Sequence, residues 1–325
     1  MANIEAKYMG LKLKSPVIVG SSGLSLKKEN IIEMEKSGAG AIVLKSLFEE
    51  QIRFEYIKQM QGNTDYPDAD AYIRQYTMQN AMDNYLELIS NAKKTVSIPI
   101  IASVNCYSDS EWQNFTDKFE KAGADALEIN IFHLPSDENI DAKEIEEKYY
   151  RIVDNILQKI SIPVSIKIGS YFTDLARFVI QLSHKKIGGL VLFNRAYSPN
   201  IDIEKQSIIY SNVFSNESDV SLPIRWTALL SGKTKCDICA TTGIHSGEDV
   251  VKLLLVGANA VQVTSLLYKK GINEISKLND FLCNWMDKNN YKSIDDFRGK
   301  MSFKAKENAA AFERVQFMKY YSGIE

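Results

Sequence analysis

Short apolar runs alternate with amphipathic stretches along the whole chain. The runs are rich in β-branched residues and contain few polar interruptions, which is typical of parallel strands buried on both faces. Eight runs are predicted to be strands: Pro16–Gly20, Ala41–Lys45, Pro99–Val104, Ala126–Asn130, Pro163–Ile168, Gly189–Asn194, Cys236–Ala240 and Ala260–Thr264.

The stretches between these runs have helical periodicity together with helix start and stop signals. Glycines such as Gly38, Gly123 and Gly257 follow them, and Ser110 and Thr173 are candidate N-caps. The predicted helices are Lys28–Ser37, Ser110–Ala122, Ala142–Ile160, Thr173–His184, Ser246–Val256 and Gly271–Asn289, followed by a C-terminal cap over Ser293–Lys306. Eight strand–helix repeats predict an α/β fold, a closed (β/α)₈ TIM barrel that forms one domain over residues 1–325.

An open doubly wound sheet is the main alternative architecture. It would normally carry a glycine-rich dinucleotide-binding turn after its first strand. The turn here reads Gly20-Ser21-Ser22-Gly23, which lacks that pattern, so the sequence favours the barrel. Long loops are expected after strands 2, 4 and 6, with the second spanning Leu47–Asp83 and the sixth Arg195–Pro223. Barrel enzymes bind substrates in the loops at the C-terminal strand ends.

Composition and charge narrow the class of partner. The chain has 325 residues, 45% of them hydrophobic, and a net charge of −2, so neither nucleic acid nor an anionic membrane is an expected partner. No apolar run reaches the about 20 residues of a membrane helix. The start of the chain lacks the basic and apolar segments of a secretion signal, which predicts a cytoplasmic protein.

The four cysteines do not form a disulfide framework in a chain of this length. Cys236 and Cys239 form a C-x-x-C pair, which could indicate redox chemistry or half of a zinc site. In a strand, however, side chains three positions apart point to opposite faces. Since no second Cys or His pair completes the set, no metal is expected.

The predicted strands end in polar residues. In chain order these ends carry Ser21 and Ser22, Lys45 and Ser46, Asn105, Asn130, Lys167, Asn194, Thr242 and Gly243, and Thr264 and Ser265. A lysine that ends a buried apolar run costs several kcal/mol without a partner. An ordinary ion pair would satisfy either lysine alone. Two such lysines with asparagines between them favour a carbonyl-rich ligand with delocalised negative charge.

The glycine and hydroxyl residues after the last two strands indicate a phosphate site. In barrels the loops after strands 7 and 8, with a nearby helix N-terminus, often hold a phosphate group. Thr242 and Gly243 precede the helix that opens at Ser246, and Thr264 and Ser265 precede another helical stretch. Together with the lysines, these residues predict a phosphate-bearing cofactor such as FMN.

A series of short motifs runs in order from Ile4 to about Lys300. The motifs are Gly20-Ser21-Ser22-Gly23, Lys45-Ser46, Asn80-Ala81-Met82-Asp83, Glu128-Ile129-Asn130-Ile131-Phe132-His133-Leu134-Pro135, Ile166-Lys167-Ile168, Asn194, Trp226-Thr227-Ala228-Leu229, Ala240-Thr241-Thr242-Gly243-Ile244, Val263-Thr264-Ser265-Leu266 and Ser293-Ile294-Asp295-Asp296-Phe297-Arg298-Gly299-Lys300. In their order and spacing they resemble the dihydroorotate dehydrogenase family, as a divergent member of its soluble class.

The resemblance implies a flavoenzyme of pyrimidine biosynthesis that oxidises dihydroorotate to orotate and forms a homodimer. FMN would lie over the barrel mouth, with Lys167 against its ring and Lys45 nearby. The implied cofactor-binding residues are Ser21, Ser22, Lys45, Ser46, Asn130, Lys167 and Asn194, with Thr242, Gly243, Thr264 and Ser265 around the phosphate. The implied residues for a pyrimidine-like substrate are Lys45, Asn80, Asn130 and Asn194.

The chain departs from the family pattern at the catalytic base. The family uses Cys or Ser in the loop after the fourth strand, and the aligned residue is His133. A neutral imidazole can act as a general base, so His133 is the predicted base. Lys167, which the resemblance places against the flavin ring, is the other predicted catalytic residue. A one-residue shift in the loop would make Ser136 the candidate instead.

Three family glycines are also replaced, by Ala240, Thr242 and Thr264, which places side chains where backbone usually approaches phosphate. These departures leave two alternatives open. One is a flavin oxidoreductase acting on a different ring or enone substrate. The other is a non-catalytic relative that binds FMN or a pyrimidine.

Overall fold

A closed parallel barrel forms the centre of the computed structural model, which describes residues 2–48, 67–106, 116–195, 199–210, 213–305 and 312. Its strands are β3 (Val17–Val19), β4 (Ala41–Val43), β6 (Ile100–Cys106), β7 (Ala126–Ile131), β8 (Val164–Ile168), β9 (Gly189–Leu192), β12 (Asp237–Thr241) and β13 (Ala260–Val263). They run in the order β4-β3-β13-β12-β9-β8-β7-β6, and a pairing between β4 and β6 closes the ring. The predicted eight-stranded barrel is therefore confirmed.

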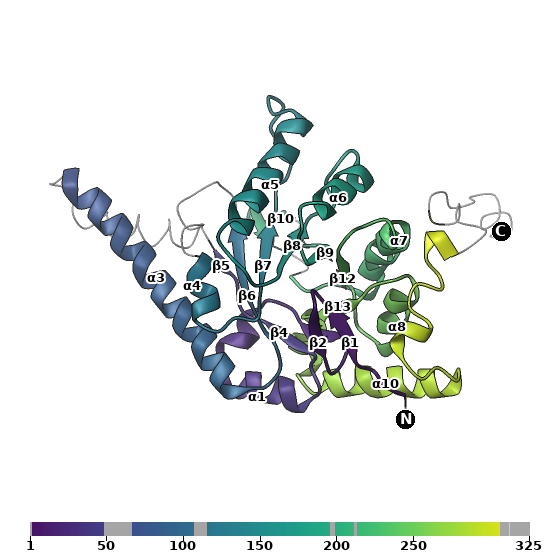
Figure 1. Ribbon diagram of the computed structural model, residues 1–325. Helices are drawn as coiled ribbons and strands as arrows, with labels where there is room; N and C mark the ends of the chain where they lie inside the picture. Colours follow the sequence, from purple (N-terminus) through teal and green to yellow (C-terminus); the bar gives the residue numbers. More distant parts are fainter. Residues whose placement is uncertain are drawn as a thin grey trace.

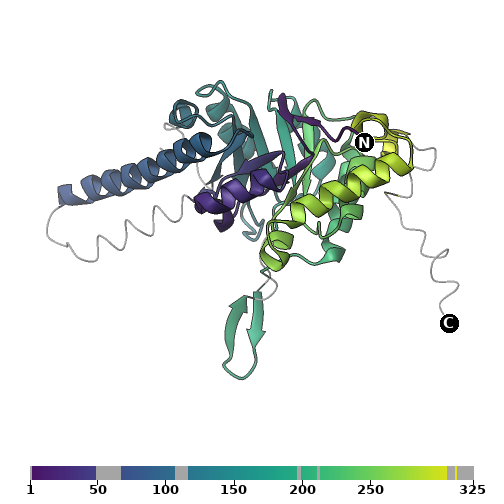
Figure 2. The ribbon, with the colours of Figure 1, turned by 90° about the horizontal axis from the view of Figure 1, so that it is seen from below.

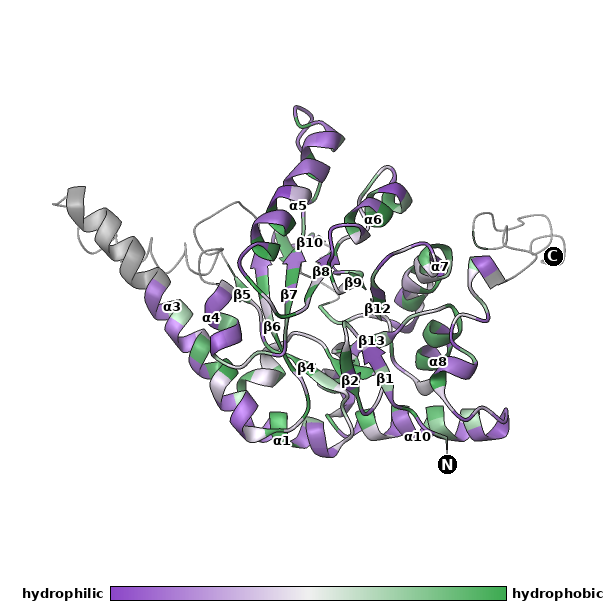
Figure 3. Cartoon of the chain, viewed as in Figure 1, coloured by the Kyte–Doolittle hydropathy of each residue, from purple (hydrophilic) through white to green (hydrophobic). Residues whose placement is uncertain are grey.

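Helices surround the strands (Figure 1). They are α1 (Lys28–Lys36), α3 (Pro67–Thr95), α4 (Thr116–Lys121), α5 (Ala142–Leu157), α6 (Leu175–Ser183), α7 (Ser221–Leu230), α8 (Gly247–Leu255), α9 (Ser265–Lys270) and α10 (Glu274–Lys288). In Figure 3 the strands are mainly hydrophobic, whereas α5 and α10 carry both kinds of residue. Among the described residues, no helix is long and apolar enough to cross a membrane.

The sequence sets these helices in place through spacing and caps. In α5, Ile145, Tyr149, Ile152 and Ile156 recur every three or four positions and are buried, which turns one stripe of the helix to the barrel. The start of α8 is a capping box: the Ser246 hydroxyl accepts the Asp249 N–H, and the Asp249 carboxylate accepts the Ser246 N–H.

Alternation along the strands divides the core in two. Residues such as Leu127 and Ile129 face the helices, whereas Ala126 belongs to a separate cluster inside the barrel. Tyr8 and Leu13 join this inner cluster from the hairpin β1 (Ala6–Tyr8) and β2 (Leu11–Leu13). Because Tyr8 packs against Gly189 at the start of β9, the hairpin closes the N-terminal end of the barrel.

The C-x-x-C pair is divided in the same way. Cys239 belongs to the inner cluster, and Cys236 packs against the outer core. The two side chains therefore face different sides of the barrel wall, as the strand prediction required.

Two predicted loops contain regular structure. The connection after the second strand includes the short strand β5 (Leu47–Phe48), which pairs with β6, and the first part of α3. The connection after the sixth contains the hairpin β10 (Pro199–Asp202) and β11 (Ser207–Tyr210), the 3₁₀ helix η3 (Glu217–Val220) and the start of α7. This hairpin projects from the barrel in Figure 2. Of the three predicted long loops, the one after the fourth strand is described in full, and it contains no helix or strand up to α5.

One predicted cap is wrong, and another lies outside the described residues. Asp174, and not Thr173, caps α6, since its carboxylate accepts the Arg177 N–H at 3.2 Å. The predicted cap Ser110 lies outside the described residues, which show the predicted helix only from Thr116 onward, as α4.

Candidate active site

A cavity of about 690 Å³ lies at the C-terminal ends of the strands. Its volume is in the range of small-molecule and cofactor sites. Every predicted cofactor-binding residue lines it: Ser21, Ser22, Lys45, Ser46, Asn130, Lys167, Asn194, Thr242, Gly243, Thr264 and Ser265. These residues come from the C-terminal ends of seven of the eight barrel strands, all except β6, so closing the barrel is what brings them together.

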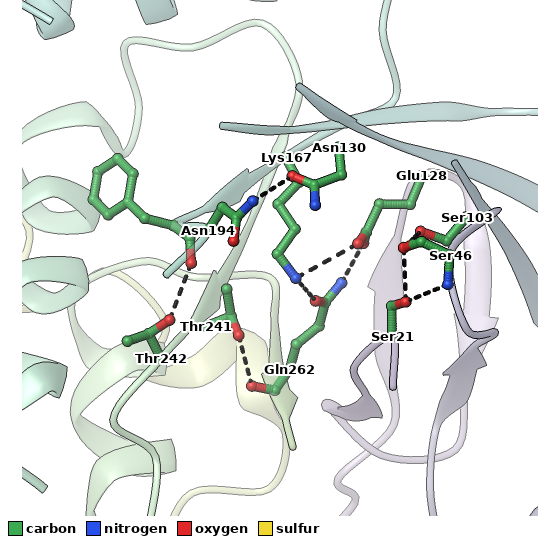
Figure 4. Close-up of polar contacts among 11 residues, drawn as sticks. Ser21, Ser46, Ser103, Glu128, Asn130, Lys167, Asn194, Thr241, Thr242 and Gln262 are labelled. Atoms are coloured by element: carbon green, nitrogen blue, oxygen red, sulfur yellow. Dashed lines mark hydrogen bonds and ion pairs between the residues drawn. The ribbon is translucent and has the colours of Figure 1, made fainter. Parts of the chain in front are cut away.

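A chain of hydroxyl groups forms one wall of the cavity. The Ser21 and Ser46 Oγ atoms are 2.9 Å apart, and the Ser46 Oγ lies 2.8 Å from the Ser103 Oγ (Figure 4). Tyr85 fixes the inner end, because its hydroxyl donates to the Ser103 carbonyl and accepts the Ser103 N–H. The wall is thus polar but internally hydrogen-bonded, which holds Ser21 and Ser46 at the cavity surface.

Lys45 is a half-buried cation at the end of β4. Its Nζ lies 4.1 Å from the centre of the Phe48 ring, and the described residues place no carboxylate within ion-pair distance of it. Burial lowers the pKa of Lys45 below its ordinary value. An anionic ligand in the cavity would stabilise a cation in this position.

Lys167 has a carboxylate partner within the protein, as expected if an ordinary ion pair satisfies its charge. Its Nζ lies 3.7 Å from Glu128 Oε1 and donates to Gln262 Oε1 at 3.2 Å. Glu128 is 1% exposed and, with Gln262, also lines the cavity. The two lysines therefore differ: Lys167 is held within a protein network, whereas the described residues offer the Lys45 Nζ only the Phe48 ring.

Two asparagines form the next part of the wall. The Nδ2 of Asn194, which follows β9, donates to the Oδ1 of Asn130 on β7 at 2.8 Å. This bond leaves the Asn130 Nδ2 and the Asn194 Oδ1 as a donor and an acceptor beside the cavity (Figure 4).

The residues predicted for phosphate follow β12 and β13, which lie between β9 and β3 in the barrel. Gly243 has a φ of 78°, and a Cβ there would come within 2.1 Å of the Val220 backbone nitrogen, so only glycine fits. Thr242 also has a positive φ, 81°, and its Oγ1 donates to the Phe193 carbonyl at 3.0 Å. The Ser265 Oγ accepts the Ser215 N–H at 3.0 Å.

The replacement of a family glycine by Thr264 is matched by Gly20. A Cβ on Gly20 would lie 2.5 Å from the Thr264 Oγ1, so the absence of a side chain on β3 makes room for the threonine on the neighbouring strand. The backbone pairing of the two strands is retained, since the Gly20 N–H donates to the Val263 carbonyl at 2.9 Å.

Three other predicted residues do not line the cavity. His133 is partly buried in the loop after β7, where burial and the nearby Lys148 lower its pKa. Ser136 follows it in the same loop and is exposed. Asn80 is exposed on α3. In this conformation the cavity therefore contains the predicted cofactor residues but neither candidate base.

Several lining residues escaped the sequence analysis, notably Glu128, Gln262, Arg195 and Ser215. Glu128 and Gln262 sit two positions after Ala126 and Ala260, which face the barrel interior. Strand alternation could have identified both as inward-facing polar residues. Ser215 comes from the connection after the hairpin, and no sequence pattern marks it.

Comparison with known proteins shows the family to which the chain belongs. The family model for dihydroorotate dehydrogenase matches residues 3–286. A dihydroorotate dehydrogenase B (NAD(+)) catalytic subunit from Thermoplasma acidophilum is 28% identical, over 92% of this chain and 99% of that relative. The corresponding subunit from Pyrococcus furiosus is 24% identical, over 91% and 98%. The chain therefore belongs to the dihydroorotate dehydrogenase family.

Proposed function

We propose that this chain is an FMN-dependent oxidoreductase that oxidises dihydroorotate to orotate in pyrimidine biosynthesis. The observation that carries the proposal is the placement of Lys45, Lys167, Asn130 and Asn194 around one cavity that Gly243 and hydroxyl side chains also line. Membership of the family supports the same reaction.

The residues of the cavity fit FMN. A ring system that becomes anionic on reduction suits a wall with two lysine side chains, and a phosphate suits Gly243, Thr264 and Ser265. Ser21 and Ser46 would contact the ring from the hydroxyl wall. When bound, FMN would supply the oxidant for the CH–CH bond, and the protein would supply binding, orientation and charge.

The substrate would be held by hydrogen bonds and one ion pair. The free donor of Asn130 and the free acceptor of Asn194 match the carbonyl and N–H groups of a pyrimidine ring. Lys45 would bind the substrate carboxylate, which gives its half-buried charge a partner. Buried amides left unpaired by a wrong substrate cost free energy, so this pair would select for the ring.

Proton removal is assigned to the loop after β7. The lowered pKa of His133 leaves its imidazole neutral at pH 7 and able to accept a proton. Since His133 lies outside the cavity wall, catalysis requires a shift of this loop toward the substrate. Ser136, in the same loop, is the second candidate base.

A second function, flavin-dependent oxidation of another ring or enone, is favoured by one observation. Neither His133 nor Asn80 lines the cavity, so two contacts implied for dihydroorotate are missing from the wall. The remaining residues would still bind a flavin and a carbonyl-bearing ring.

Purified protein should be loaded with FMN and mixed anaerobically with dihydroorotate. Loss of the yellow flavin absorbance, with formation of orotate, is the expected result. A yellow protein that dithionite bleaches but dihydroorotate does not would favour the second function. Failure to take up FMN at all would refute both functions.

A homodimer in the cytoplasm is part of the proposal. It follows from resemblance to the soluble class of the family. Light scattering on a size-exclusion column measures the oligomeric state directly, and a monomer at working concentration would contradict this part.

A further inference from the structure

Glu128 is a buried carboxylate inside the barrel that the proposed reaction does not use. It is 1% exposed, and its side chain points from β7 toward Lys167 on β8 and Gln262 on β13 (Figure 4). The Glu128 Oε1 has no hydrogen-bond partner among the described residues, and its nearest positive charge is the Lys167 Nζ at 3.7 Å. A carboxylate is kept in such a place only with a compensating cation.

Gln262 connects the two charges across the barrel. Its Nε2 donates to Glu128 Oε2, and its Oε1 accepts from the Lys167 Nζ at 3.2 Å. The reverse orientation of the amide would set its oxygen against the carboxylate and its N–H groups against the ammonium. The two charges therefore fix the amide, and the amide in turn fixes the Nζ.

The network leaves Lys167 able to contact a ligand. Beyond Gln262 and Glu128, the described residues offer its Nζ no further partner, and the side chain is 14% exposed at the cavity wall. At least one N–H group is thus left for the cavity. The Glu128 carboxylate lies 3.7 Å from the Nζ, so it both anchors the lysine and offsets its charge.

We propose that Glu128 is a positioning residue for Lys167. Through Gln262 it holds the lysine Nζ at the cavity wall, and its negative charge limits how strongly the site favours reduced, anionic flavin. The inference rests on the proposed function, because it concerns bound FMN. It assigns separate tasks to the two partners: Glu128 sets the charge, and Gln262 transmits the geometry.

The test is a reductive titration of the FMN-loaded protein with dithionite against a reference dye, together with the rate of flavin reduction by dihydroorotate. The variants are Glu128→Gln, Gln262→Met and, as a matched control, Ser165→Ala. Ser165 is fully buried on β8 two residues before Lys167, and it does not line the cavity.

Glu128→Gln removes a negative charge beside the flavin. We expect its ratio of reduced to oxidised FMN affinity to rise about tenfold, a shift of about 30 mV upward for two electrons. Gln262→Met changes no charge, so its potential should match that of the parent, but its reduction by dihydroorotate should slow about tenfold. Ser165→Ala should match the parent in both measurements.

An unshifted potential in Glu128→Gln would overturn the charge assignment, and an unchanged rate in Gln262→Met would overturn the bridge. If Glu128→Gln fails to fold, an unchanged reduction rate in Gln262→Met still overturns the positioning role of Glu128, because that role acts through Gln262. A parent protein that dihydroorotate does not reduce refutes only the substrate, since dithionite supplies electrons for the titration. A parent that takes up no FMN refutes the proposed function and this inference with it.

Discussion

Asn194 and Asn130 join across the intervening strand β8, with the Asn194 Nδ2 donating to the Asn130 Oδ1 at 2.8 Å. Each amide fixes the orientation of the other, which leaves one donor and one acceptor for a ring in the cavity. Asn194→Ala removes the acceptor and releases the Asn130 amide. We expect the affinity for orotate to fall about 10- to 100-fold, as about 1–3 kcal/mol for an unsatisfied buried group implies.

Titration of the flavin spectrum with orotate measures this affinity. Asn200→Ala is the matched control, because Asn200 is exposed on the projecting hairpin. If Asn194→Ala binds orotate as tightly as the parent does, the asparagine pair has no part in recognising the ring.

His133 provides a prediction about pH. Burial and Lys148 lower its pKa below the ordinary value of about 6.5. A protonated imidazole cannot accept a proton, so the rate of flavin reduction should be steady at neutral pH and fall as the pH drops through that lowered value. His133→Ala should lose about 10²- to 10⁴-fold in this rate, together with the acid limb.

Stopped-flow reduction by dihydroorotate at a series of pH values tests this assignment. His184→Ala should behave as the parent, since His184 is exposed at the end of α6. A normal rate in His133→Ala combined with an inactive Ser136→Ala would transfer the role of base to Ser136.

The state of Lys45 leads to a prediction about how the affinity for orotate changes at alkaline pH. Its pKa is lowered by burial, so in the free protein it loses its proton at a lower pH than an ordinary lysine. Binding of the orotate carboxylate should therefore weaken as the pH rises through that lowered value, and it should be unaffected at more acid pH. Lys45→Met removes the charge at similar length and should bind orotate weakly, without this alkaline decline.

Orotate dissociation constants between about pH 6 and pH 10 give the comparison. Lys12→Met serves as the control, because Lys12 is exposed on β2 at the other end of the barrel. An alkaline decline that persists in Lys45→Met would mean that another group controls binding.

Parts of the fold were predictable because burial dictates the sequence directly. Parallel strands are covered on both faces, and the runs at Ala126–Asn130 and Ala260–Thr264 coincide with β7 and β13 to within one residue. The helix α3 was missed although Met82, Tyr85, Ile89 and Ala92 are buried at helical spacing. The polar stretch before them was interpreted as a substrate loop that extends to Asp83, so the helical spacing of these four residues was overlooked.

The site residues that lie at strand ends were predictable from the sequence. The contacts that site residues make across the barrel were not. The positions of Lys45 and Lys167 follow from the ends of two apolar runs. Their different partners depend on Glu128 and Gln262, which lie 134 residues apart in sequence and meet only when the barrel closes. Local spacing carries no information about such a contact.

A comparison of Gly243 with Gly271 distinguishes the cost of crowding in the phosphate turn from the cost of a positive φ. Both have a positive φ, 78° and 99°, but a Cβ at Gly243 would collide with the Val220 backbone, whereas nothing lies within 4 Å of one at Gly271. Gly271→Ala should cost about 1–3 kcal/mol of unfolding free energy, because its φ of 99° and ψ of 163° lie in a region that is essentially restricted to glycine. Gly243→Ala should cost about 3 kcal/mol or more, since overpacking adds to that penalty.

Urea unfolding of the two variants measures these costs in stability. FMN titration shows which variant also loses affinity for the cofactor. Because Gly243 lines the cavity and Gly271 does not, only Gly243→Ala should lose affinity for FMN. Equal losses of stability would mean that the turn moves away from Val220 freely. Unchanged FMN affinity in Gly243→Ala would show that this turn does not hold the phosphate, which would then have to bind through Thr264 and Ser265 alone.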